Sequence, residues 1–216
     1  MTLIPITAEE LLTTTRSVRK RLDLTRPVDL DLVHEALTVA LQAPSGSNRQ
    51  GWHFVVVTDP AKRAVIGDYY GRAVEAYLAS AGSAAKMHAE DPQRAPVQHR
   101  VGDSVAHLGR VMGQVPVLVL PCLRVSNLSA DSQAGVWGSI LPAAWSYMLA
   151  ARLRGLGTAW TTLHLEYERE IAELLDLPDG IRQAALIPTA HTVGTDFKPA
   201  PRQPLAEVLH VDGWWG

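Results

Sequence analysis

The chain has 216 residues, of which 47% are hydrophobic and 19% are charged, a composition that is ordinary for a globular protein with a substantial core. Its formal net charge of -2 gives no electrostatic reason to expect a nucleic acid or an anionic membrane as a partner, and we predict neither. The single cysteine, Cys122, excludes an intrachain disulfide, and its apolar neighbours predict a buried thiol.

The start of the sequence does not read as a targeting segment. The first twelve residues have no basic region and no long apolar stretch, so we do not expect a signal peptide. The longest apolar run, residues 115–123, contains two prolines and is too short to cross a bilayer. We therefore expect a cytoplasmic protein.

Capping residues and apolar periodicity define the elements of the first part of the chain. In order, we expect a helix at residues 7–16, a helix at 29–43, a strand at 53–58 and helical structure at 59–81. Thr7 and Glu10 have capping-box spacing, and Asp29 can cap the second helix. The run at 53–58 is continuously apolar and branched from residue 54 on, which predicts a buried strand.

The second part of the chain predicts three more strands between helices. In order, we expect a polar loop at residues 82–98, a helix at 101–112, a strand at 115–120, a helix at 137–157, a strand at 158–163, a helix at 166–175 and a strand at 184–193. Gly155 and Gly157 are stop signals for the long helix, and Pro142 should bend it or mark its first turn. A tail rich in proline and glycine follows, and we expect it to run over a surface of the protein. Because no repeat or linker divides the chain, we predict one domain, residues 1–216, of the α/β or α+β class.

Several common motifs are absent or out of context. The sequence "GLGTAW" has the first two glycines of a dinucleotide fingerprint, but it follows a helix instead of a strand. There is no phosphate-loop lysine motif and no nucleophile elbow. The eight histidines include no close pair with metal-ligand spacing, so we expect no metal site.

Four polar segments remain as candidate ligand-binding positions. They are Arg16, Ser17 and Arg19 after the first helix; Pro44, Ser45, Gly46 and Asn48 in a loop; Thr162, Leu163 and His164 at a strand end; and Arg202 in the tail. Arginine can hold a phosphate through charge-assisted hydrogen bonds worth about 1.5–3 kcal/mol each. The alternative interpretations without a ligand are that the Arg16–Arg19 cluster complements a helix dipole and that Arg202 is a solvated surface residue.

In this order and spacing the four segments resemble the FMN-dependent nitroreductase family. The resemblance rests on "RSVR", "APSGSNRQGWHF", "GLGTAWTTLHLEYEREIAELLDLPDG" and "KPAPRQPLAEVLHVDGW", and it covers nearly the whole chain. It implies an α+β fold of three layers, in which helices flank a central mixed, mainly antiparallel sheet and an extended C-terminal tail follows. It also implies an interlocked homodimer.

The resemblance assigns a role to each segment. The phosphate and ribityl end of FMN would be held by Arg16, Ser17, Arg19 and Arg202. The flavin of the partner subunit would be contacted by Pro44, Ser45, Gly46 and Asn48. The isoalloxazine would lie near Thr162, Leu163 and His164, which would offer backbone donors. Two positions depart from the family pattern: Arg21 stands where relatives often have an aromatic residue, and His164 where they usually have glycine or an acidic residue.

The implied activity belongs to the flavin, which the protein binds and orients. NAD(P)H would reduce FMN, and a nitroaromatic, quinone or similar small-molecule acceptor would then take the electrons in a ping-pong cycle. No side chain is assigned a catalytic role; His164 is the one to test, although we expect it to be structural. The alternatives are a flavin enzyme that oxidises a biosynthetic intermediate with oxygen, and a flavin-holding protein closed by a lid at residues 82–98. Four tryptophans in apolar runs, Trp52, Trp137, Trp145 and Trp160, are expected in the core.

Overall fold

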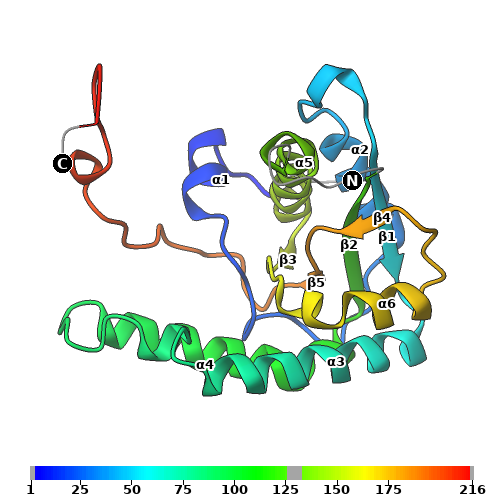
Figure 1. The fold of residues 1–216 in the computed structure, drawn as a ribbon, viewed down its shortest axis with the longest axis horizontal. Helices are drawn as coiled ribbons and strands as arrows, with labels where there is room; N and C mark the ends of the chain where they lie inside the picture. Colours follow the sequence, from blue (N-terminus) through cyan, green and yellow to red (C-terminus); the bar gives the residue numbers. More distant parts are fainter. Residues whose placement is uncertain (1–2, 126–132, 215–216) are drawn as a thin grey trace.

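The centre of the fold is a five-stranded sheet, seen in a computed structural model that describes residues 3–125 and 133–214 (Figure 1). Four strands follow one another across the sheet: β1 (Trp52–Val57), β2 (Val117–Arg124), β5 (Ile187–His191) and β3 (Leu156–Thr158). The fifth strand, β4 (Ile181–Gln183), pairs with β2 beside β5. All four ladders are antiparallel, and Ser17 forms an isolated parallel bridge with Thr158 outside the named strands, so the predicted mainly antiparallel sheet is confirmed.

Helices cover both faces of the sheet and give the fold three layers (Figure 1). They are α1 (Ala8–Thr14), α2 (Leu30–Ala40), α3 (Pro60–Ala79), α4 (Ala95–Val111), α5 (Gln133–Leu153) and α6 (Glu168–Leu174). Alternate residues of β2 face opposite cores: Val117 and Val119 pack with α2 and α5, while Leu118 and Leu120 pack with α3 and α4. This alternation is the period of a strand buried on both faces. The predicted α+β class is confirmed.

The helices begin at the capping residues that the sequence predicts. Thr7 and Glu10 exchange both hydrogen bonds of a capping box at the start of α1. The Asp29 carboxylate accepts from the backbone N–H of Asp31, and Asp59 caps α3 with Pro60 in the first turn. Cys122 is fully buried, and burial raises the pKa of its thiol to about 12, so the buried thiol is confirmed as well.

The strand predicted at residues 158–163 is wrong in position. β3 ends at Thr158, and a 3-10 helix, η5 (Leu163–Tyr167), occupies the end of the predicted strand. Gly155 does follow α5 with a φ of +76°, but Gly157 lies inside β3. A Cβ on Gly157 would lie 2.5 Å from the Thr192 side chain, so close packing rather than helix termination explains this glycine.

Other boundaries also differ from the sequence prediction. β2 continues through Pro121 to Arg124, α4 begins at Ala95 within the predicted loop, and β4 was not predicted. Pro142 lies inside α5, whose described part begins nine residues earlier at Gln133, so it does not mark the first turn. Trp145 is 37% exposed on α5, contrary to the core placement, whereas Trp52 is buried.

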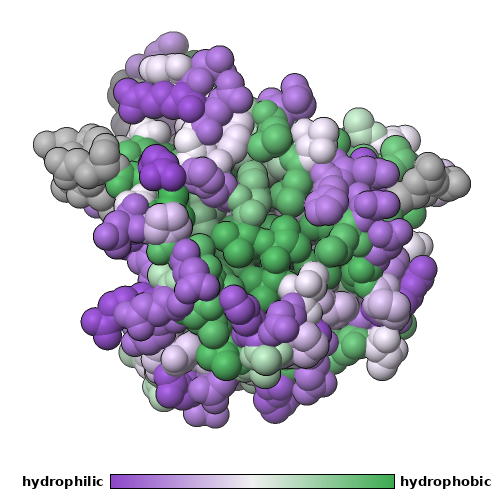
Figure 2. Space-filling view, turned by 90° about the vertical axis from the view of Figure 1, so that its right-hand side faces the viewer, coloured by the Kyte–Doolittle hydropathy of each residue, from purple (hydrophilic) through white to green (hydrophobic). Residues whose placement is uncertain are grey.

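Strand β1 lies at an edge of the sheet instead of its middle. His53 is exposed, and Phe54, Val55 and Val56 are only half-buried, so the expected burial of this strand is not found within one chain. Figure 2 views the side of the molecule where β1 is the outermost strand and shows hydrophobic side chains gathered in the middle of that face. No helix within the described ranges is both long and apolar enough to span a membrane.

The C-terminal tail leaves β5, passes α1 and extends away from the sheet (Figure 1). Its apolar side chains are largely exposed: Leu205, Val208, Leu209, Val211 and Trp214. The prediction that the tail covers a surface is therefore not fulfilled within a single chain.

Candidate functional site

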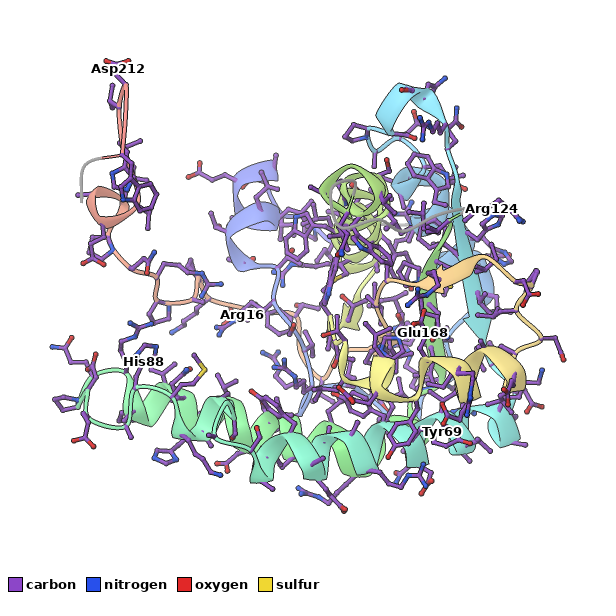
Figure 3. All side chains as sticks on the ribbon, in the orientation of Figure 1. Arg16, Tyr69, His88, Arg124, Glu168 and Asp212 are labelled. Atoms are coloured by element: carbon purple, nitrogen blue, oxygen red, sulfur yellow. The ribbon has the colours of Figure 1, made fainter. Side chains whose placement is uncertain are left out.

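The first candidate segment runs alongside the end strand of the sheet. After α1, the backbone N–H of Val18 donates to the carbonyl of Thr158 at 2.8 Å, which fixes Ser17 beside β3. Arg16 and Ser17 are exposed, and Arg16 lies beside the tail where the tail leaves the sheet (Figure 3). Its Nη1 donates to the carbonyl of Lys198 at 3.3 Å. Because the residue is exposed and this is its one described hydrogen bond, the guanidinium could also donate to an anion.

Arg19 turns toward the helices on the other side of the segment. Its Nη1 donates to the Ser104 hydroxyl on α4 at 3.4 Å. Burial lowers the pKa of Arg19, while neighbouring Tyr70 and Tyr77 act in the opposite direction. The Tyr70 hydroxyl in turn lies 3.1 Å from the Thr161 hydroxyl. Arg19 and the chain around Thr161 therefore meet through Tyr70, which the sequence did not single out.

The third candidate segment, residues 162–164, comes directly after Thr161 in the chain. Thr162 is exposed and precedes η5, which begins at Leu163. Thr161 pairs with Leu186 through two backbone hydrogen bonds of 3.2 and 2.9 Å, so the exposed residue Thr162 directly follows a position that is fixed to the sheet. This is a position from which main-chain N–H groups can reach a ligand.

His164 points inward from η5. Its side chain is fully buried, and neither ring nitrogen has a hydrogen-bond partner within the described chain. Burial lowers the pKa of His164 to about 4, although the Glu168 carboxylate opposes this shift. The imidazole is therefore neutral near pH 7. A buried, neutral side chain that cannot reach solvent favours the structural role expected for it over proton transfer.

Glu168 holds η5 and α6 against β4. Its carboxylate accepts hydrogen bonds from Arg182 Nε at 2.8 Å, from Arg182 Nη2 at 2.6 Å and from the backbone N–H of Gln183 at 3.0 Å. Burial opposes ionisation, but these hydrogen bonds keep the pKa of Glu168 below its usual value. Glu168 lies over this end of the sheet in Figure 3.

The second candidate segment, the loop at residues 44–48, lies elsewhere. It contains the 3-10 helix η1 (Gly46–Asn48), and Figure 1 shows it beyond α5, far from the base of the tail. The backbone N–H of Gly46 donates to the Ser139 hydroxyl on α5 at 3.0 Å. Ser47 and Asn48 both have a φ of +52°, a strained backbone region for residues other than glycine. Strain of this kind is often found where a loop binds a ligand.

Arg202 is separate from both groups. Its described hydrogen bond goes to the carbonyl of the preceding residue, Pro201, at 3.0 Å, and its side chain is exposed. A single chain brings two of the four predicted segments together: Arg16, Ser17 and Arg19 with Thr162, Leu163 and His164. The other two segments lie apart from them: Pro44, Ser45, Gly46 and Asn48, and Arg202. No group of three His, Cys, Asp or Glu side chains suited to a metal ion occurs within residues 3–125 and 133–214.

Fold and site together define a three-layer α+β protein with an exposed cationic segment beside a sheet edge, an arrangement suited to a phosphate-bearing ligand. The model of the nitroreductase family matches residues 12–191. The chain therefore belongs to the nitroreductase family. Membership supports an oxidoreductase of the flavoprotein class.

Individual relatives agree with this placement. The chain is 30% identical over 211 residues to an NADH dehydrogenase of Thermus thermophilus, with 90% of each chain covered. It is 32% identical over 143 residues to a 5,6-dimethylbenzimidazole synthase of Rhodospirillum rubrum, a match that spans 63% of this chain and 61% of that protein. The fold is similar to that of an iodotyrosine deiodinase solved with FMN and 3-iodo-L-tyrosine, with a TM-score of 0.70 at 21% identity over 97% of this chain and 100% of the other.

Proposed function

We propose that the protein is an FMN-dependent oxidoreductase that takes electrons from NAD(P)H and passes them to a small electron-poor acceptor such as a nitroaromatic or a quinone. The observation that carries this proposal is the exposed Arg16–Ser17 pair fixed beside Thr158 at the end of β3, four residues before the exposed Thr162, in a chain of the nitroreductase family. We propose further that it works in the cytoplasm.

The residues at this edge suit FMN. Arg16 keeps free guanidinium donors, and no ion pair involves Arg16 or Arg19 in the described parts of the chain, so a phosphate dianion would not compete with a carboxylate there. Ser17 adds an exposed hydroxyl. When bound, FMN would supply the redox chemistry by accepting a hydride from the nicotinamide and releasing electrons to the acceptor in a separate half-reaction.

The chain's own residues would bind and orient the cofactor. Arg16, Ser17 and Arg202 would hold the phosphate, and Arg19 would lie nearer the ring because it is anchored toward Tyr70 and Ser104. Thr162 and Leu163 would offer backbone N–H donors to the isoalloxazine. His164 would support this turn from the core, since it is buried and neutral.

A homodimer would complete the site. The loop at 44–48 and Arg202 lie away from the Arg16 segment, β1 leaves an apolar edge (Figure 2), and the tail exposes large apolar side chains. An interlocked second copy would cover these surfaces and bring its own loop to the flavin of its partner, with two equivalent sites per dimer. Light scattering should show a dimer, and a stable monomer that still contains flavin would refute this arrangement.

The absorption spectrum of the purified protein tests the proposal most directly. We expect a yellow protein whose flavin is released on denaturation, because the binding is non-covalent. Anaerobic mixing with NADPH or NADH should bleach the flavin rapidly, and a nitroaromatic or quinone should restore the colour. A colourless protein that takes up no added FMN would end this proposal.

A second candidate is a flavin enzyme that oxidises a biosynthetic intermediate with oxygen as the acceptor. The similarity to the Rhodospirillum rubrum synthase favours it. The anaerobic experiment separates the two, because in the second case neither nicotinamide should bleach the flavin quickly. In a flavin-holding protein without turnover, neither nicotinamide should bleach the flavin quickly either. In addition, no added acceptor should reoxidise its flavin after chemical reduction.

A further inference from the structure

An aromatic ring at the base of the tail lies between two arginines. Phe197 has the Arg21 Cζ 4.2 Å from its ring centroid and the Arg152 Cζ at 4.7 Å. Both distances are within the range of cation–π attraction. The three residues, which we call the Phe197 stack, join the segment after α1, the last turn of α5 and the first residues of the tail.

Arg21 shapes the turn that leads into the tail. Its Nε donates to the carbonyl of Val193 and its Nη1 to the carbonyl of Asp196, both at 2.8 Å. Gly194 between them has a φ of +74°, and a Cβ at this position would lie 2.7 Å from Arg21 Nη2. The turn is therefore built closely around this guanidinium.

Arg152 is the second arginine that contacts the ring. It is 7% exposed, and its guanidinium donates to the carbonyl of Thr14 at 3.1 Å and to the Thr14 hydroxyl at 2.7 Å. Burial and the charge of Arg21 lower the pKa of Arg152. A buried cation without a carboxylate is costly, so its hydrogen bonds to α1 and its contact with Phe197 are what compensate it.

The stack lies next to the proposed phosphate site without being part of it. Arg16 is two residues beyond Thr14 and reaches the tail at Lys198, the neighbour of Phe197. Arg16, Arg21 and Arg152 all contact the tail between residues 193 and 198, and none of them forms an ion pair within the described residues. The donors of Arg21 and Arg152 are directed mainly to backbone and Thr14, so neither is assigned to the ligand.

We propose that the Phe197 stack is a positioning device that fixes the base of the tail so that Arg16, and Arg202 farther along the tail, are held for the FMN phosphate. The proposal rests on the proposed function. Arg16, Arg21 and Arg152 all contact this short stretch of the tail, and a phosphate dianion bound at Arg16 would reduce the repulsion among these three cations. Occupancy by FMN and order at the base of the tail are therefore coupled.

The test compares FMN affinity in three single variants. Phe197→Leu keeps apolar volume and removes both cation–π contacts, so the Kd for FMN should rise about 5- to 30-fold. Phe197→Tyr keeps the ring and should stay within about threefold of wild type. Tyr69→Leu is the matched control: it removes a half-buried ring on α3 whose centroid lies 4.9 Å from Arg72 Cζ, and it should not weaken FMN binding to a similar degree.

Trypsin cleavage between Arg202 and Gln203 gives a second measurement. FMN should slow this cleavage in wild type and Phe197→Tyr, and much less in Phe197→Leu. Should Phe197→Leu not fold, Arg21→Lys replaces it, because lysine keeps the charge but loses the fork that holds Val193 and Asp196. Its FMN affinity should fall to a similar extent.

The outcomes separate this proposal from the function on which it rests. Wild-type protein that binds no FMN defeats the proposed function itself. Wild-type protein that binds FMN, with Phe197→Leu changed less than twofold, overturns the stack alone. Equal weakening by Phe197→Leu and Phe197→Tyr also overturns it, because loss of the ring face would then not be the cause.

Discussion

The chain holds its two groups of candidate site residues in different ways. The segment from Arg16 to Arg19 is tied into the fold by the Val18–Thr158 backbone bond and by the contacts of Arg19 with α3 and α4. The loop around Gly46 and the tail around Arg202 have few such ties: one serine hydroxyl for the loop, and a neighbouring carbonyl for Arg202. We call the first group, residues 16–19 with residues 162–164, the closed half of the candidate site, because a single chain holds it in place. The loop at residues 44–48 and Arg202 are the open half.

This difference indicates where a second copy would act. Backbone hydrogen bonds to the sheet edge fix the closed half of the candidate site whether or not a second chain is bound. The open half offers polar groups and largely exposed apolar side chains, and ordering them costs conformational entropy that a further contact could repay. The comparison therefore predicts that perturbing the open half disrupts assembly and FMN binding together, whereas the closed half depends mainly on local packing.

The largest effect is expected from removing the tail. Deletion of residues 203–216 should convert the dimer to a monomer and abolish FMN binding at micromolar concentration, because the exposed apolar residues of the tail would no longer cover the partner. Light scattering and FMN fluorescence quenching measure the two effects. Leu209→Asp should act in the same direction, while Val65→Asp, an exposed apolar position on α3, should leave both unchanged. A dimeric, yellow deletion variant would show that the tail is dispensable.

Arg202 tests whether the open half reaches the phosphate. Arg202→Ala should weaken FMN binding about 10- to 150-fold, since a charge-assisted contact contributes about 1.5–3 kcal/mol, and the apoprotein should remain folded. Arg202→Lys should recover part of the loss because charge remains without the bidentate fork. Arg169→Ala, an exposed arginine on α6, is the control. Equal FMN affinity in all four proteins, measured by fluorescence quenching, would remove Arg202 from the site.

His164 tests the closed half through pH. Its folded-state pKa of about 4 lies below the ordinary value of 6.5, so between these values the unfolded chain binds more protons. The contribution is fully present above pH 6.5 and is lost as the pH falls toward 4, by about 3 kcal/mol in total. Urea unfolding of the apoprotein should show this loss, and His164→Phe should flatten it. His99→Gln, at an exposed position on α4, should keep the wild-type profile, and an unflattened profile in His164→Phe would contradict this account.

Local signals in the sequence were enough to predict much of the fold. The caps at Thr7 and Asp29 depend on side chains within three residues of the helix start, and both occur as predicted. β3 and β4 depend on distant partners instead. In β3, Gly157 packs closely against Thr192, and the three residues of β4 pair with β2 while Glu168 binds Arg182 and Gln183. No local pattern encodes such pairings.

The candidate site shows the same division. The motif segments were found because arginine, serine and a strained loop carry a visible chemical signature. Tyr70, Ser139 and Phe197 were missed because nothing in their own neighbourhood distinguishes them from ordinary helix or tail residues. The hydrogen bonds of Tyr70 and Ser139 span 91 and 93 positions of the sequence, and Phe197 contacts Arg21 and Arg152 from distant segments. Likewise β1 carries the apolar run of an interior strand but occupies an edge, which is understandable if its missing cover belongs to another chain.

The smallest predicted effect concerns Ser139, the one side chain outside the loop whose described hydrogen bond ties the loop to the rest of its own chain. Ser139→Ala leaves the backbone N–H of Gly46 without its acceptor in a part-buried place, a loss of about 0.5–1.5 kcal/mol in loop order. If the loop contacts the flavin of the partner subunit, FMN affinity should fall about 2- to 10-fold while the dimer persists. Ser139→Thr keeps the hydroxyl and should bind FMN nearly as wild type does, and Ser146→Ala, two turns further along α5, is the control. Unchanged affinity in Ser139→Ala would mean that the loop is ordered entirely by the second chain, which would make the open half of the site more dependent on dimerisation than the single hydrogen bond suggests.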